Sequence, residues 1–229
     1  MRGKLTNNAV TIKIFAMITM MIDHIGYILY GAIPESAYMI LRAVGRISFP
    51  LFAFCIAEGF YHTKNVKKYI IRVLIFALIS EIPYNVFLTG NIIYVKSCNV
   101  LFTFVIALLV LWFCRYCDSL GRKAMPLSVL GVLAGMAFAY LIKSDYSYRG
   151  IALVVVLYYT RFNEYIRCIA SCLILWISGE ITALLSPLAL VLIHFYNGEK
   201  GKMNKWICYV FYPLQFLVIG VLGRYLLYG

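Results

Sequence analysis

The stretch IKIFAMITMMIDHIGYILY, residues 12–30, decides the fold, because it is an apolar segment long enough to cross a lipid bilayer. A bilayer core about 30 Å thick needs roughly 17–25 mostly apolar residues in a helix. The interior of this stretch nevertheless holds Asp23 and His24 next to each other. A charged side chain at such a depth costs roughly 2.5 kcal/mol or more, so it is retained where a polar cavity uses it. The stretch therefore predicts a membrane helix that contributes to a functional site.

The rest of the chain has the same character. Hydrophobic residues make up 63% of the 229 residues and charged residues 13%, which is far from the composition of a soluble domain. No linker indicates a second domain, so residues 1–229 are predicted to form a single all-α domain, a polytopic transmembrane helix bundle. About nine spans are expected, with a range of eight to ten: residues 10–31, 37–61, 69–89, 99–117, 125–142, 149–161, 165–179, 180–197 and 205–227.

Lysine and arginine are distributed unevenly between the two sides of this predicted bundle. Nine spans place most of them on one side and only Lys96, Lys143 and Arg149 on the other. The first group comprises Arg2, Lys4, Lys64, Lys67, Lys68, Arg72, Arg115, Arg122, Lys123, Arg161, Arg167, Lys200, Lys202 and Lys205. Because cytoplasmic loops collect positive charge, we expect the amino terminus inside and the carboxyl terminus outside. The net charge of +12 is then explained by topology, and we expect no nucleic-acid partner.

Five ionisable side chains fall at a similar depth when the spans are counted at 1.5 Å per residue. They are Asp23 and His24 in the first span, Arg42 and Arg46 in the second and Glu81 in the third. An imidazole beside a carboxylate is a common general base near neutral pH. We therefore expect His24, Asp23, Arg46 and Glu81 to be catalytic, with Asp23 orienting the imidazole. A structural ion pair between Asp23 and either arginine is the alternative.

Two further polar side chains are candidates for binding. Asn99 lies close to the polar layer, and Glu58 lies near the inner end of the second span, where it could bind a cofactor or only support packing. No second histidine has helical spacing to His24 and no thiol pair converges on it, so we expect no metal site. A Gly-x-Ser-x-Gly motif and a phosphate-binding glycine loop are also missing from the sequence. This pattern favours direct group transfer through a general base.

Several blocks of the sequence resemble the TraX family along nearly the whole chain. They are residues 12–26 (IKIFAMITMMIDHIG), 41–54 (LRAVGRISFPLFAF), 57–65 (AEGFYHTKN), 80–84 (SEIPY), 99–103 (NVLFT), 145–146 (DY) with Gly150, 196–198 (YNG) and 211–214 (FYPL). The family is known for acetylating the amino terminus of F-pilin and looks like a branch of the transmembrane acyltransferases. In those relatives an early-helix histidine is the usual catalytic candidate, which corresponds to His24. Gln215 departs from the histidine expected after the Tyr-Pro-Leu block.

The resemblance implies an integral membrane acetyltransferase, in a bacterial cytoplasmic membrane, that uses cytoplasmic acetyl-CoA. The acceptor would be an amine or hydroxyl of a peptide, a pilin, a sugar or a small amine. His24 would deprotonate it, and Arg42 or Arg46 would stabilise negative charge or grip a substrate. Lys64, Lys67 and Lys68 would attract the polyanionic nucleotide of the coenzyme.

Two other classes of function remain open at this stage. In a proton-coupled transporter or flippase, Asp23, His24 and Glu81 would form a proton relay. No internal repeat relates the two halves of the sequence, which makes a transporter less favoured. An accessory scaffold for a secretion or pilus machine would explain the membrane spans but leave the polar layer without a purpose.

Overall fold

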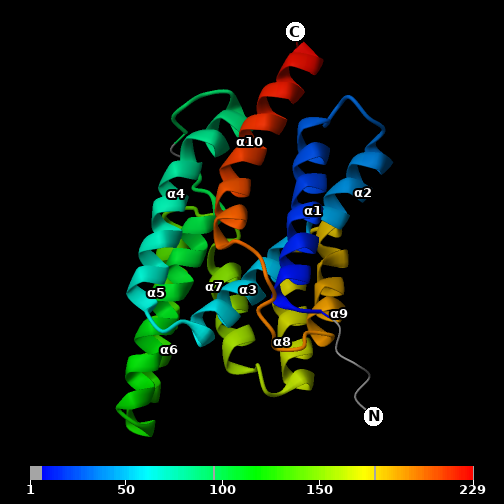
Figure 1. Cartoon of the computed structure of the whole chain (residues 1–229). Helices are drawn as coiled ribbons and strands as arrows, with labels where there is room; N and C mark the ends of the chain where they lie inside the picture. Colours follow the sequence, from blue (N-terminus) through cyan, green and yellow to red (C-terminus); the bar gives the residue numbers. More distant parts are fainter. Residues whose placement is uncertain (1–6, 95, 178, 229) are drawn as a thin grey trace.

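The computed structural model describes residues 7–94, 96–177 and 179–228, and it is built from helices (Figure 1). These residues form no strand, only two isolated bridges, so the predicted all-helical bundle is confirmed. The elements are α1 (Ala9–Ile28), α2 (Glu35–Gly45), α3 (Ser48–His62), α4 (Val66–Thr89), α5 (Val100–Ser119), η1 (Arg122–Ala124), α6 (Met125–Leu141), α7 (Ser147–Tyr159), α8 (Glu164–Trp176), η2 (Ile181–Leu188), α9 (Ala189–His194) and α10 (Lys205–Tyr228). Arg2 and Lys4, which entered the topology prediction, lie outside the described residues.

Six helical segments of the described chain are long and apolar enough to cross a membrane. They cover Ala9–Ile28, Glu35–His62, Val66–Thr89, Val100–Ser119, Arg122–Leu141 and Trp206–Gly223. The predicted spans 149–161, 165–179 and 180–197 fall on α7, α8 and the η2–α9 pair, which are shorter. A helix of 13 residues, such as α7 or α8, reaches only about 20 Å of a core about 30 Å thick. The expected count of about nine spans is therefore not confirmed.

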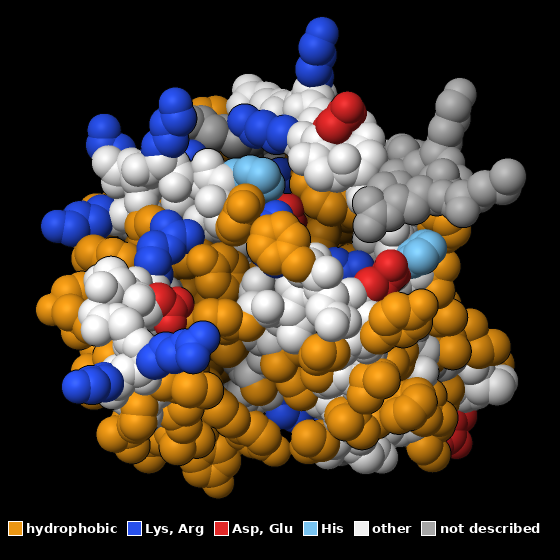
Figure 2. Space-filling model, turned by 90° about the horizontal axis from the view of Figure 1, so that it is seen from below, with side chains coloured by type: hydrophobic (Ala, Val, Ile, Leu, Met, Phe, Trp, Pro, Cys, Tyr) orange, Lys and Arg blue, Asp and Glu red, His pale blue; other side chains and the backbone are white. Residues whose placement is uncertain are grey.

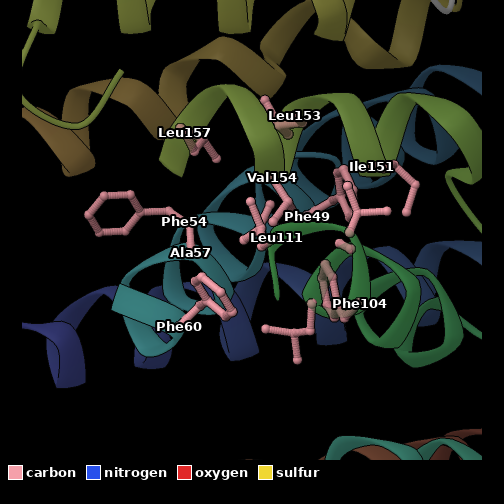
Figure 3. Close-up of a cluster of buried hydrophobic side chains, with 14 of the residues drawn as sticks. Phe49, Phe54, Ala57, Phe60, Phe104, Leu111, Ile151, Leu153, Val154 and Leu157 are labelled. Carbon is pink, nitrogen blue, oxygen red and sulfur yellow. The ribbon is translucent and has the colours of Figure 1, made fainter. Parts of the chain in front are cut away.

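Helix α3 lies in the centre of the bundle, where it packs against α5 and α7 (Figure 3). Phe49, Phe54 and Phe60 of α3 are almost completely buried there. They meet buried side chains of the other two helices, which include Phe104, Leu111, Ile151, Leu153, Val154 and Leu157. Many apolar residues on the outer faces of α4, α6 and α8 are exposed instead, as expected for surfaces that face lipid.

Main-chain hydrogen bonds fix which loops share an end of the bundle. The Asn7 N–H donates to Phe195 O at 3.0 Å, and the Ala9 N–H donates to Glu199 O at 2.8 Å. The loop after α9 therefore lies beside the start of α1, and we call this the basic end. Lys and Arg side chains gather over much of this end (Figure 2). The clustering agrees with the predicted charge asymmetry, whereas the side that faces the cytoplasm stays a prediction.

The opposite end is fixed by a second set of main-chain contacts. The Cys98 N–H donates to Lys143 O at 3.2 Å, and the Asp145 N–H donates to Cys98 O at 2.9 Å. These bonds bring the connection between α6 and α7 to the start of α5. Asp145 is thereby placed among residues that are distant in sequence.

Helices α1 and α2 approach closely because a glycine lies at their contact. A Cβ atom on Gly45 would come within 2.2 Å of the Asp23 Cβ. Small residues at such positions allow backbones in a membrane to approach closely. The contact sets the position of the polar side chains that follow on both helices.

Candidate functional site

A cavity of about 560 Å³ extends through the bundle along α1, and we call it the larger cavity. Its walls come from α1, α3, α4, α5 and α10, together with the two connections around residues 145 and 200. Along α1 the lining runs from Ala9 to His24, a distance of about 22 Å at 1.5 Å per residue. The volume lies within the range of roughly 300–1,000 Å³ that is typical of small-molecule and cofactor sites. A long, thin ligand therefore fits this space.

Three cations from different elements line the larger cavity near its basic end. Lys13 comes from α1, Arg72 from α4 and Lys200 from the loop that follows α9. The Arg72 guanidinium lies 5.9 Å from the Tyr209 ring centre. In the described structure none of the three forms a salt bridge. Cations directed into a membrane cavity without an acidic partner favour an anionic ligand.

The sequence did not single out this set as binding residues, and the expectation that Lys64, Lys67 and Lys68 attract the coenzyme stays a prediction. Those three side chains are exposed near the start of α4 and do not belong to the cavity lining. The sequence feature that could have identified the cavity cations is a single cation about one turn inside an otherwise apolar span, as at Lys13 and Arg72. The orientation of the protein in the membrane explains cations in the loops. It does not explain cations inside a span, which indicate another role.

His24 reaches the larger cavity at its far end, inside an aromatic surround. The imidazole centre lies 4.5 Å from the Phe216 ring and 5.3 Å from the Phe87 ring. Its Nδ1 atom is buried and has no hydrogen-bond partner among the described residues. Gln215 of α10 lies close enough to interact with the ring. The position at which the sequence departs from the expected family histidine thus faces His24.

Asp23 does not contact His24 as expected, because its carboxylate is turned toward α2. The Arg42 guanidinium donates to Asp23 Oδ2 at 2.7 Å and to the Asp23 main-chain oxygen at 3.3 Å. Adjacent residues of a helix point in different directions, so the two side chains separate. The alternative interpretation, a structural ion pair, holds for Arg42. Asp23 lines the larger cavity together with His24, whereas Arg42 does not.

Arg46 links the deep end of the larger cavity to the connection before α7. Its guanidinium donates to Tyr146 Oη at 3.3 Å and to Glu180 Oε2 at 3.1 Å. Asp145 lies in the same cluster and lines the cavity. Burial raises the pKa of the Asp145 carboxyl, and the nearby Arg46 partly offsets this by lowering it. Asp145 and Tyr146 belong to a block that resembles the family, but they were not expected in the site because they lie in a connection between predicted spans. Glu180, at the first residue of the span expected at 180–197, was not expected there either.

Glu81 and Asn99 pair with each other and do not line the larger cavity. The Asn99 side-chain amide donates to Glu81 Oε2 at 2.6 Å and to Ala77 O at 2.9 Å, and its main-chain N–H donates to Glu81 at 3.2 Å. Asn99 also caps α5 by accepting from the Leu101 N–H. The two predicted site residues therefore connect α4 to α5, a structural contact that helical spacing alone did not distinguish from a shared catalytic layer.

Glu58 lines the larger cavity and is held in an ionic cluster at the basic end. The Arg161 guanidinium lies 3.0 Å from its carboxylate, and His62 Nε2 lies 3.3 Å from it. A third contact joins Arg115 to the main-chain oxygen of Phe60 at 3.2 Å. The sequence left two roles open for Glu58, cofactor binding and a packing role. These ion pairs support the packing role. No group of three or more His, Cys, Asp or Glu side chains gathers as metal ligands in the described ranges.

Comparison with known proteins shows the family of this chain. The family model described as TraX protein matches residues 8–223, which is nearly the whole chain. The chain belongs to the TraX family. It is 29% identical to "Probable fimbrial assembly protein FimC, serogroup H1" of Dichelobacter nodosus, and the match covers 93% of this chain and 94% of that protein. It is also 32% identical to "Uncharacterized protein RP591" of Rickettsia prowazekii (strain Madrid E), over 56% of each chain. No solved structure matches this TraX-family chain.

Proposed function

We propose that this TraX-family protein is a membrane acetyltransferase that moves an acetyl group from cytoplasmic acetyl-CoA to an amine of a membrane or exported acceptor. The observation that carries the proposal is the larger cavity, which joins three cations at the basic end to His24 at the far end. The coenzyme has a polyanionic nucleotide, a long thin arm and a terminal thioester. Phosphates would bind Lys13, Arg72 and Lys200, and the thioester would lie beside His24.

The reaction needs one proton carrier and no covalent enzyme intermediate. The acceptor nitrogen forms a bond to the acetyl carbonyl carbon while the bond from that carbon to sulfur breaks. His24 takes a proton from the nitrogen and returns it to the leaving thiolate sulfur. General-base catalysis of this kind contributes about 10²–10⁴-fold, so positioning and electrostatic stabilisation supply the remainder.

Arg46 is the side chain best suited to stabilise the developing oxyanion. It lines the cavity, as His24 does, and it keeps its charge at all relevant pH values. Its two contacts, to Tyr146 and Glu180, hold the guanidinium in place before substrate arrives. Preorganised donors of this kind stabilise a transition state without reorganising during the reaction.

The acceptor is proposed from the name of a relative, not from the geometry of the site. The name of the Dichelobacter nodosus relative refers to fimbrial assembly. We therefore favour an exported peptide amine, such as the amino terminus of a pilin, over a sugar or a hydroxyl group. The protein would lie in the cytoplasmic membrane of a bacterium, with its basic end and amino terminus inside and its carboxyl terminus outside.

A proton-coupled transporter or flippase is the alternative, and one observation weighs against it. The proposed relay needs Asp23, His24 and Glu81 to share a path. Glu81 instead bonds to Asn99 and does not line the cavity that holds the other two.

Purified protein in sealed, uniformly oriented vesicles tests the function. Acetyl-CoA is supplied on one side at a time and free thiol release is followed. We expect release only when acetyl-CoA faces the basic end. Proton flux without thiol release would favour the transporter, and equal release from both sides would refute the one-sided donor route.

A further inference from the structure

A smaller cavity of about 140 Å³ lies on the other side of the Arg46 cluster. Its own lining comes from α7, α8 and η2, and includes Arg149, Ala183 and Ser186. It shares four lining residues with the larger cavity, namely Arg46, Phe49, Asp145 and Tyr146. These four side chains therefore form a partition between two chambers, each with a separate set of helices around it.

The connection that carries Tyr146 has an unusual backbone. Tyr146 has a φ of 59° and its ring lies 3.5 Å from the Phe49 ring in a stacked arrangement. Lys143 and Ser147 also have positive φ values, of 53° and 43°. Non-glycine residues in this region store strain and concentrate at functional sites. The connection is further fixed from α5, because Thr103 Oγ1 donates to Ser144 Oγ at 2.9 Å.

The size of the smaller cavity limits what it can hold. A volume of about 140 Å³ is well below the roughly 300 Å³ at which small-molecule pockets usually begin. The end of a chain fits such a space. The larger cavity is the one suited to a cofactor-sized ligand.

The charges of the smaller cavity indicate the chemistry of that chain end. Two carboxylates, Asp145 and Glu180, line it together with two guanidinium groups, Arg46 and Arg149. The Asp145 carboxylate accepts a hydrogen bond from the adjacent Tyr146 N–H at 3.0 Å and forms no salt bridge within the described residues. An ammonium group supplies the donors that such a carboxylate accepts, and a guanidinium suits a carbonyl oxygen next to it.

We propose that the smaller cavity is the acceptor site, which binds a primary amine at the end of a chain, with Asp145 on the nitrogen and Arg149 on the neighbouring carbonyl oxygen. This inference rests on the proposed function. The acceptor then meets the thioester at the partition, having entered separately from the donor. The ammonium loses its first proton to solvent before attack, and the second passes to His24 during attack.

Filling the smaller cavity tests the assignment. Ala183 is buried in its wall and does not line the larger cavity, so Ala183→Leu removes space from the acceptor side alone. Ala134→Leu places the same change on the exposed face of α6 and is the matched control. Arg149→Gln is a second variant, which shortens the side chain, removes its charge and keeps a polar amide. The probes are trialanine amide and, for comparison, glucosamine, with the acetyl-CoA dissociation constant measured separately.

We expect acetyl-CoA consumption by the wild-type protein to be accelerated by trialanine amide and not by glucosamine. Ala183→Leu and Arg149→Gln should raise the KM for trialanine amide at least tenfold and change the acetyl-CoA dissociation constant less than twofold. The inference is overturned if neither variant changes this KM, if glucosamine is the better acceptor, or if neither probe accelerates a protein that binds and slowly hydrolyses acetyl-CoA. Failure to bind acetyl-CoA at all would instead refute the proposed function.

Discussion

Arg42 of α2 forms an ion pair of 2.7 Å with Asp23 of α1, and both side chains are mostly buried, with exposed fractions of 12% and 14%. This ion pair joins α1 to α2, so Asp23 and Arg42 have a structural role. Because the Asp23 carboxylate is paired with Arg42, the proposed mechanism does not use a carboxylate that is hydrogen-bonded to His24. The imidazole instead packs against the Phe87 and Phe216 rings.

The first prediction concerns this pair. Asp23→Asn or Arg42→Gln alone should destabilise the protein by about 3 kcal/mol, because each leaves a buried charge without its partner. The double variant should lose less than the sum of the two, with a coupling energy of at least about 1 kcal/mol. Reversible unfolding in detergent measures all four proteins. Strictly additive losses would show that the two side chains do not act as a pair.

The second prediction separates Glu81 from catalysis. Glu81→Gln weakens the contact with Asn99 and should lower stability by about 1–2 kcal/mol, since the acceptor of this hydrogen bond loses its charge. The kcat and KM of the protein that remains folded should change less than twofold. A fall in kcat of tenfold or more, at unchanged stability, would return Glu81 to the catalytic set.

A third prediction distinguishes cavity cations from loop cations. Lys13→Ala and Arg72→Ala should each raise the KM for acetyl-CoA about tenfold or more, because a charge-assisted contact to phosphate contributes about 1.5–3 kcal/mol. Lys67→Ala and Lys68→Ala are the matched controls, because these side chains are exposed outside the cavity lining. Equal effects in both sets would mean that the donor is attracted by general surface charge.

The fourth prediction is the orientation of the bundle. Reporter fusions near Lys67, Lys123 and Lys202 should report the cytoplasm, and a fusion near Lys96 should report the opposite side. The charge asymmetry and the shared basic end both lead to this expectation. An external location for the Lys67 fusion would reverse the route proposed for acetyl-CoA.

The fold class was predictable because composition and the length of apolar segments determine it. The number of spans was not, since residues 149–197 are mostly apolar, whereas α7, α8 and α9 are short and pack against a common core. An apolar segment can be buried against lipid or against other helices, and its composition is similar in both cases. Composition alone therefore does not predict whether such a segment forms a helix long enough to cross the membrane.

The candidate site was predictable only for side chains inside spans. His24, Asp23, Arg46 and Glu58 do line the larger cavity, as a search for buried polar residues suggested. Depth alone could not tell that Glu81 bonds to Asn99 or that Arg42 bonds to Asp23, because depth does not fix which way a side chain turns. Asp145 and Tyr146 belong to a sequence block that resembles the family, but their place in the cavity wall follows from the three-dimensional path of the connection that carries them.

The most direct test of the account is the rate of acetyl transfer by purified His24→Ala protein, measured beside its affinity for acetyl-CoA. The substitution removes the proton carrier and leaves the three cavity cations in place. We predict that acetyl-CoA still binds within about threefold of the wild-type affinity, while transfer falls by roughly 10²-fold or more. A folded His24→Ala protein that transfers acetyl groups at the wild-type rate would contradict the central claim.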